Sequence, residues 1–305
     1  MSSFLYLRQI LEDRLEPAAR KWFKTASAEM ADDVSGRRFG ALLSTASRHA
    51  RRRPLELDEG DLAQAAKVLP GWNPERWNLL EALRVALILS RGDLKTEQAA
   101  VDIEEAFQYA DEGELCALYR SLAHLPDAAR FAWRAGEGCR SNMVTVFEAV
   151  ALDTPYPREH FDDATFRQAA IKALFVEAPL WRLVGLDERG DAELARMALD
   201  LAEERRSAGR EVQPELWLCL GTHGGDRGLS SLVEEFAPEN PSTRGRAAAA
   251  LGLARAGQAD LLRQRLEGEA DPVVRETLAT ALEGHTDPSA FRPFSAEVSA
   301  AGTES

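Results

Sequence analysis

The chain has 305 residues, of which 45% are hydrophobic and 29% charged, as is typical of a soluble globular protein. Lys and Arg together number 37 and Asp and Glu 50, so the net charge is −13 at pH 7. This acidity argues against a nucleic-acid partner and against docking on anionic lipid, because both need a basic face. The stretch "RHARRRP" at 48–54 is an exception. We interpret it as the C-terminal end of a helix, with a patch for an anionic partner as the alternative.

The sequence carries no signal for export or membrane insertion. Four charged residues interrupt the first fifteen, which argues against a secretory signal peptide. The most apolar stretch, Leu79–Ser90, is too short to span a bilayer and contains Glu81 and Arg84. The three cysteines are odd in number and far apart, which fits buried thiols in a reducing compartment. We therefore expect a cytoplasmic protein with no direct membrane insertion.

Apolar residues recur with a helical period along almost the whole chain. In the N-terminal half this period predicts helices at about Phe4–Lys24, Ser35–Arg51, Asp58–Leu69, Glu75–Leu89 and Lys95–Tyr109. The apolar positions from Phe166 to Leu174 follow the same rule, and Asp191 and Gly209 are predicted to begin and end a later helix. Sustained alternation of apolar and polar residues is missing from the sequence, so we predict an all-α fold.

The C-terminal third contains an internal repeat. The segments "LWLCLG" (Leu216–Gly221) and "AAAALG" (Ala247–Gly252) begin 31 residues apart, and "LATALE" (Leu278–Glu283) begins a third copy that then decays. An alanine-rich helix after a proline turn is similar to the short HEAT-like repeat, a two-helix unit that stacks into a solenoid. The repeat therefore predicts an α-α superhelix, that is, a HEAT-like helical solenoid.

We expect a single all-helical domain over residues 1–295, because no long linker divides the chain. Its parts would be N-terminal helices over about 1–113, a middle region over 114–213 and HEAT-like repeats over 214–290. Residues 296–305 are small and polar, and they are predicted to form a disordered tail.

The familiar catalytic and cofactor motifs are missing from the sequence. It contains neither GxxxxGK[ST] nor GxGxxG, and neither HExxH nor GxSxG. The glycine-rich "THGGDRG" (Thr222–Gly228) is interpreted as a turn between helices. His160, Asp162 and Asp163 could ligate a metal, but Asp162 is better explained as a helix cap and Asp163 as a first-turn residue. We therefore assign no metal site, no cofactor and no catalytic residue.

Polar side chains are densest between residues 140 and 187. This region could form a pocket for a small anionic or hydroxylated ligand, or else a buried ion-pair network. The candidate ligand-binding residues are Arg140, Asn142, Glu148, Tyr156, His160, Lys172, Arg182 and Asp187.

The run from Glu137 to Trp217 resembles the EboA family of bacterial proteins. The resemblance rests on GCRxN, FEAxAL, PYPxxxF, KALF with PLW, GLDxR and AGRxVxPELW, which follow one another in the family's order. A looser likeness extends to "ALYRSLAHLPD" (Ala117–Asp127), and Thr154 and Arg167 stand where the family pattern has asparagine.

The resemblance implies an accessory role in a small bacterial gene cluster. That cluster is implicated in moving secondary-metabolite precursors, such as those of an indolic-phenolic sunscreen pigment, from cytoplasm to periplasm. The implied partners are the cluster's UbiA-like membrane prenyltransferase and its TIM-barrel hydrolase- and isomerase-like proteins, alongside a dehydroquinate-synthase-like protein. The family has no established catalytic residues to carry over to this chain.

Three hypotheses follow. The first is a protein without catalysis that binds a small-molecule metabolite or partner proteins of the cluster. The second is an enzyme in which Glu148, His160, Lys172, Arg182 and Asp187 would act as acid, base and anion-holding groups, provided that they converge in one pocket. The third is a pure scaffold whose concave solenoid face binds a protein.

Overall fold

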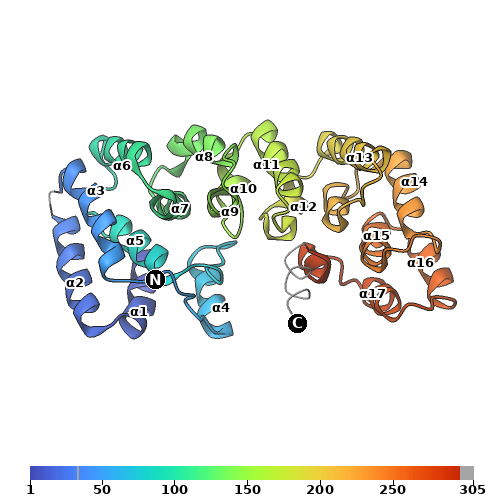
Figure 1. The fold of residues 1–305 in the computed structure, drawn as a ribbon, viewed down its shortest axis with the longest axis horizontal. Coiled ribbons are helices and arrows are strands. Elements are labelled where there is room, and N and C mark those ends of the chain that lie inside the picture. The colour runs from blue at the N-terminus through green and yellow to red at the C-terminus, as the bar shows by residue number, and fades with distance from the viewer. Residues whose placement is uncertain (33, 296–305) are drawn as a thin grey trace. The chain divides into compact units, whose positions relative to one another are not determined.

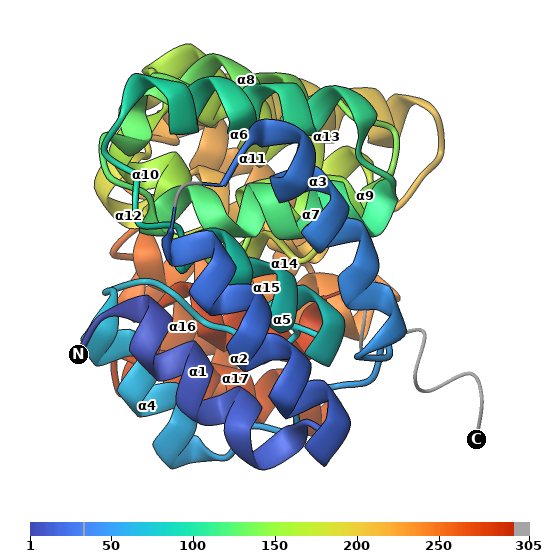
Figure 2. The ribbon, with the colours of Figure 1, turned by 90° about the vertical axis from the view of Figure 1, so that its left-hand side faces the viewer.

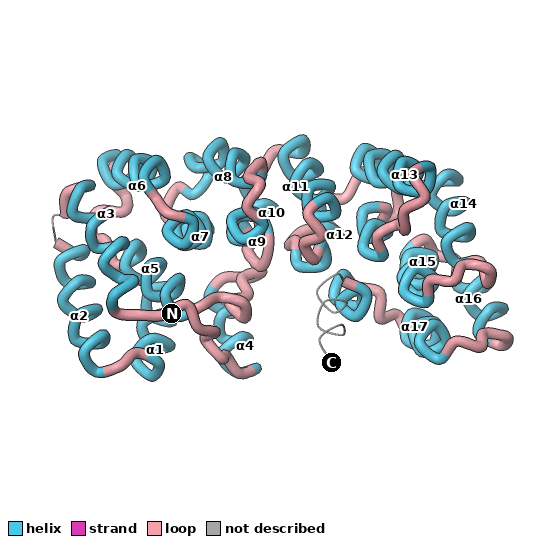
Figure 3. The backbone as a smooth tube through the Cα atoms, viewed as in Figure 1, coloured by secondary structure: helices cyan, strands magenta, loops and turns pink. Residues whose placement is uncertain are grey.

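The computed structural model describes residues 1–32 and 34–295, and these divide into two compact units. Unit 1 comprises Met1–Phe161 and unit 2 comprises Asp162–Ser305. The described residues form helices and no strand, with one isolated bridge between Pro54 and Asn78 (Figure 3). The prediction of an all-α fold is therefore confirmed. The predicted tail at 296–305 lies outside the described residues.

Unit 1 is built around a buried helix, α5 (Leu79–Leu89), against which α1, α2 and α7 pack (Figures 1 and 2). Ten of the eleven residues of α5 are buried, which explains why this segment is the most apolar of the chain. The other elements of unit 1 are α1 (Ser3–Arg14), α2 (Pro17–Ala31), α3 (Gly36–Thr45), η1 (Ala46–Arg48), α4 (Glu59–Val68), α6 (Glu97–Tyr109), α7 (Glu112–Ser121), η2 (Leu122–His124), η3 (Ala128–Phe131), α8 (Ala132–Cys139), α9 (Val144–Ala151) and α10 (Tyr156–His160).

The prediction of one continuous helix over Phe4–Lys24 is wrong. The chain leaves the helical conformation at Leu15 and Glu16, whose ψ angles are 143° and 153°, and Pro17 then begins α2. Proline disfavours the helical conformation of the residue before it, but it suits the first turn of a helix because it lacks an N–H. The apolar period continues across this break because both helices turn an apolar face towards α5.

Unit 2 centres on α15 (Thr243–Arg255), which packs against α14, α17 and η5. Its alanines 247–250 are fully buried, and a Cβ added to Gly252 would lie 2.5 Å from Leu232 Cδ2. Small side chains therefore let the neighbouring helices approach closely. The other elements of unit 2 are α11 (Asp163–Phe175), η4 (Leu180–Arg182), α12 (Leu186–Arg189), α13 (Ala192–Ser207), η5 (Pro214–Cys219), α14 (Gly225–Phe236), α16 (Ala259–Leu266), α17 (Pro272–Leu282) and η6 (Pro288–Phe294).

The predicted helix boundaries in unit 2 are confirmed where they rest on capping residues. Asp162 accepts a hydrogen bond from the Thr165 amide at 2.7 Å, and Asp191 accepts one from the Leu194 amide at 2.8 Å. Gly209 follows α13 with φ +66°, the left-handed conformation that commonly follows a helix end.

The three repeat segments occupy η5, α15 and α17, so the first copy is a 3-10 helix where the other two are α-helices. The 31-residue repeat and the solenoid stay predictions, as does the single domain over 1–295. None of the helices in the described part of the chain combines the length and apolarity that crossing a membrane requires.

Candidate functional site

The eight predicted ligand-binding residues are divided between the two units. Unit 1 contains Arg140, Asn142, Glu148, Tyr156 and His160, and unit 2 contains Lys172, Arg182 and Asp187.

Among these residues in unit 1, the rings of Tyr156 and His160 are in contact, with their centroids 4.8 Å apart. Tyr156 is buried, and its hydroxyl donates to the carbonyl oxygen of Ala128 at 2.7 Å, so this ring holds α10 against η3. Burial raises the pKa of Tyr156. Arg140 and Asn142 are exposed, and Arg140 pairs with Glu137 one turn earlier. Glu148 is half-buried in α9.

In unit 2 Arg182 is buried in η4 and Lys172 is half-buried on α11. Asp187 is exposed on α12 and forms an ion pair with Arg255 of α15. Asp187 also borders a cavity of about 260 Å³ that contains neither Lys172 nor Arg182. The arrangement thus places one predicted residue at a cavity of this unit.

His223 and Arg255 also line that cavity, and neither is among the ligand-binding residues predicted from the sequence. His223 lies in the "THGGDRG" loop, whose glycines suggested only a turn. Arg255 is held in place, because its Nη1 donates to the Thr286 carbonyl oxygen at 2.6 Å while its Nη2 pairs with Asp187. Arg255 therefore braces α12 and the segment after α17 against α15.

The paired aspartates at 162–163 have structural partners. Asp162 caps α11, and the hydrogen bond from Thr165 keeps the pKa of Asp162 low. Asp163 accepts a hydrogen bond from Arg189 at 2.7 Å. The described residues include no group of three or more His, Cys, Asp or Glu side chains that could hold a metal ion.

The three cysteines are buried and free of disulfides. Burial raises the pKa of Cys116 to about 11 and the pKa values of Cys139 and Cys219 to about 12. Because the thiolate is the nucleophilic form, these thiols are unreactive near neutral pH.

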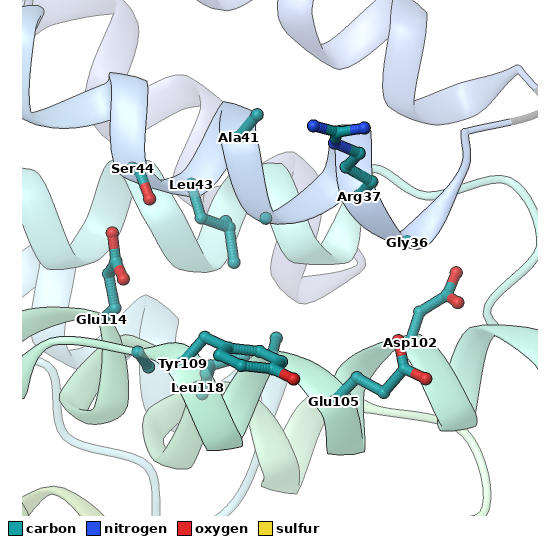
Figure 4. A pocket seen from close by; sticks show the side chains of 13 residues that line it. Gly36, Arg37, Ala41, Leu43, Ser44, Asp102, Glu105, Tyr109, Glu114 and Leu118 are labelled. Atoms are coloured by element: carbon teal, nitrogen blue, oxygen red, sulfur yellow. The ribbon is translucent and has the colours of Figure 1, made fainter.

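The pocket drawn in Figure 4 lies entirely within unit 1, between α3, α6 and α7, and has a volume of about 370 Å³. Figure 4 shows α3 along one side, carrying Arg37, Ala41 and Leu43, and α6 along the other, carrying Glu105 and Tyr109. The full lining is Gly36, Arg37, Gly40, Ala41, Leu43, Ser44, Asp102, Glu105, Ala106, Tyr109, Ala110, Glu114 and Leu118. We call this the α3–α6–α7 pocket.

Two glycines of α3 shape this pocket in different ways. A Cβ on Gly36 would lie 2.6 Å from Asp102 Oδ1, so glycine is needed where α3 approaches α6. A Cβ on Gly40 would meet no heavy atom within 4 Å, so this position opens onto free space. Ala106 and Ala110 on the facing helix are also small, and the cavity is the space that these short side chains leave.

Two carboxylates in the wall are neutralised by arginines from behind. Arg91 Nη2 lies 2.8 Å from Asp102 Oδ2, and Arg84 Nη2 lies 3.3 Å from Glu114 Oε1. Burial acts against the charged form of Arg91, but its bonds to Asp93 and Asp102 outweigh this, so the pKa of Arg91 is raised. Burial lowers the pKa of Arg84. These buried pairs fix the wall and cancel its charge.

The charged groups that remain at the mouth are Arg37 and Glu105, one of each sign, and both are exposed. Tyr109 is 85% exposed, so one large aromatic ring borders the pocket without being used for packing. Leu43 and Leu118 supply apolar surface deeper in the lining. An apolar cavity with a few polar groups and a free aromatic ring suits a small molecule with little net charge.

The fold and this pocket define an all-α protein with a ligand-sized cavity enclosed by three helices of one unit. Residues 4–221 match the family model described as "Metabolite traffic protein EboA". The match covers well over half of the chain, so the chain belongs to the EboA family, and the predicted resemblance is confirmed. The matched range includes the whole α3–α6–α7 pocket. Neither a curated protein nor a solved structure matches the chain.

Proposed function

We propose that this protein binds a small metabolite without transforming it, and thereby helps other proteins of its gene cluster to move metabolite precursors from cytoplasm to periplasm. The observation that carries the proposal is the α3–α6–α7 pocket, a preformed cavity inside the region that matches the metabolite-traffic family. Under this proposal the protein is cytoplasmic, and its partners are the UbiA-like prenyltransferase and the TIM-barrel hydrolase- and isomerase-like proteins of the cluster.

The composition of the pocket supports binding rather than catalysis. Its two inner carboxylates are neutralised by Arg84 and Arg91, so neither is available as a general base. The buried thiols, with raised pKa values, are unavailable as nucleophiles. The ligand that fits is a small molecule with an apolar or aromatic body and hydroxyl groups, stacked on Tyr109.

The experiment is to identify small molecules that copurify with the protein from its native host, by mass spectrometry of the denatured eluate. The Gly40→Leu variant places a side chain in the open space of the pocket, where a Cβ meets nothing within 4 Å. Gly268→Leu makes the same change at another unobstructed glycine, in unit 2, and serves as the control. We expect one molecule to copurify with the wild type and with the control variant but not with Gly40→Leu. If Gly40→Leu retains that molecule, the pocket is not its site.

Docking of a partner protein is a second candidate, favoured by the exposed ring of Trp133. This tryptophan on α8 is 68% exposed, which is unusual for so large an apolar side chain, and Arg134 lies 5.0 Å from its ring centre. Trp133→Ala should weaken capture of a purified cluster protein by tenfold or more if this ring is an anchor. Equal capture by the variant would show that Trp133 does not anchor the partner.

A further inference from the structure

We infer that a second cavity of unit 1, between α1 and α2, binds an amphiphilic anion: a molecule with an apolar chain or ring system and one anionic group. The proposal goes beyond the proposed function, because it concerns another cavity, other residues and a charged ligand, whereas the ligand of the α3–α6–α7 pocket has little net charge. The cavity has a volume of about 630 Å³, within the usual range for small-molecule sites. Its lining consists of Phe4, Arg8, Glu12, Arg20, Lys21, Phe23, Lys24, Ser27, Ala28, Ala31 and Ser90, and we call it the cationic groove.

The groove is lined by two consecutive helices, α1 and α2, which the extended residues Leu15 and Glu16 connect. Phe4, Arg8 and Glu12 are four residues apart, so they share one face of α1. Both helices pack on α5 (Figure 2). Ser90, which follows α5, borders the groove. Arg8 on α1 and Lys24 on α2 both line the groove, so each helix contributes cationic groups to it.

The groove also has apolar surface in its lining. The Phe23 ring is buried and Phe4 is half-buried. Ala28 and Ala31 are exposed and supply methyl groups. Because the two aromatic rings are buried or half-buried in the lining of a cavity, a single inserted molecule can contact them more readily than the interior of a bilayer can. This favours a monomeric amphiphile over a membrane surface.

The charge of the groove is opposite to that of the chain as a whole. Arg8, Arg20, Lys21 and Lys24 are exposed cations, and Glu12 is the single carboxylate in the lining, whereas the chain carries a net charge of −13. None of these four cations forms an ion pair within the described residues, although many other surface arginines do, among them Arg38 and Arg196. Four unpaired cations beside apolar surface attract an anionic group on an apolar body.

An independent observation at the groove is an unpartnered hydroxyl. Ser27 Oγ is buried and has no hydrogen-bond partner among the described residues. The other serine of the lining differs, because Ser90 Oγ donates to the Leu87 carbonyl oxygen at 2.7 Å. A buried hydroxyl without a partner is destabilising, because it has given up its hydrogen bonds to water. Ser27 is one helical turn from Lys24 on α2, so an anionic group held by Lys24 can accept this hydrogen bond.

The probe for the test is dodecyl phosphate below its micellar concentration, titrated into the full chain by calorimetry. We expect one molecule of dodecyl phosphate to bind per chain. Inorganic phosphate, which lacks the alkyl chain, and dodecyltrimethylammonium, which has the same chain on a cationic group, should not bind. Lys24→Glu should weaken binding at least tenfold, and Ser27→Ala several-fold. Lys67→Glu on α4 makes the same charge reversal at an exposed position outside the groove and should bind like the wild type.

Several outcomes would overturn the inference. Equal binding of the cationic detergent would show that charge plays no part. Unchanged affinity in a folded Lys24→Glu variant, verified by circular dichroism, would place the anion elsewhere. Loss of dodecyl phosphate binding in Gly40→Leu would assign the probe to the α3–α6–α7 pocket instead. Cosedimentation with phosphatidylglycerol vesicles, without binding of the monomeric probe, would mean that the cations contact a membrane.

Discussion

A half-buried histidine of unit 1, His124, should make the stability of that unit fall as the pH drops below about 7. His124 lies against Trp72, with ring centroids 4.5 Å apart, and its Nδ1 is 2.9 Å from Ser3 Oγ. Its Nε2 is buried and has no hydrogen-bond partner among the described residues. Burial lowers the pKa of His124 to about 3, because no nearby carboxylate compensates for the loss of water.

The sign and size of the effect follow from proton linkage. In the unfolded chain a histidine has a pKa of about 6.5, so below that value the unfolded state binds one proton that the folded state excludes. The free energy of unfolding is therefore fully retained above about pH 7 and falls by roughly 1.4 kcal/mol per pH unit well below pH 6.5. Between pH 7 and 5.5 the expected loss is about 1.3 kcal/mol. The loss stops only near the folded-state pKa of about 3.

The perturbation is His124→Asn, which keeps a polar group near Ser3 but cannot titrate. The assay is amide hydrogen exchange of peptides from α1 and α5, which pack on each other in unit 1, at pH 7 and pH 5.5 after correction for the intrinsic exchange rates. The wild type should lose about 1.3 kcal/mol more than the variant over this interval. His49, whose pKa is also lowered by burial, contributes equally to both proteins and cancels in the difference.

His285→Asn serves as the control, because this side chain is 70% exposed and lies in unit 2. Its removal should leave the pH dependence of the stability of unit 1 unchanged. The reasoning is refuted if His124→Asn and the wild type lose equal stability between pH 7 and 5.5. In that case His124 would be protonated in the folded protein.

The remaining predictions concern packing, a buried ion pair and the thiols. Gly36→Ala should lower the free energy of unfolding by about 1–3 kcal/mol, because its Cβ would lie 2.6 Å from Asp102 Oδ1. Gly40→Ala should raise it by up to about 1 kcal/mol, since alanine favours a helix and its Cβ meets nothing within 4 Å. Urea unfolding of both variants measures this pair, and equal effects would contradict the assigned packing. Arg91→Met should cost about 3–5 kcal/mol by the same assay, because it leaves the buried Asp102 without its countercharge, and a cost below about 1 kcal/mol would contradict this role. The cysteines should stay unmodified by a thiol reagent at pH 7.5 until the chain is unfolded in denaturant, and modification of the native protein would show that a thiol is accessible.

Helical structure and its boundaries were largely predictable from the sequence because they depend on neighbours in the chain. A cap such as Asp162 or Asp191 acts on an amide three residues away, so its role can be inferred without knowing the rest of the fold. The error at Leu15–Glu16 has the same origin. The apolar period is continuous there, so it does not reveal the new helix that begins at Pro17. Family membership was also predictable, since the motifs lie close together between Glu137 and Trp217.

The location of the cavities depended on tertiary structure. The eight predicted ligand-binding residues are close in sequence but fall in two units, and one of them, Asp187, borders a cavity of unit 2. The α3–α6–α7 pocket joins residues as far apart as Gly36 and Leu118, and its features in the sequence are glycines and alanines that carry no chemical signal. A cavity is the space that packing leaves unfilled, so it is set by contacts between distant helices. Sequence alone therefore determined the helices, the acidic character and the family, whereas the fold decided where a ligand has room to bind.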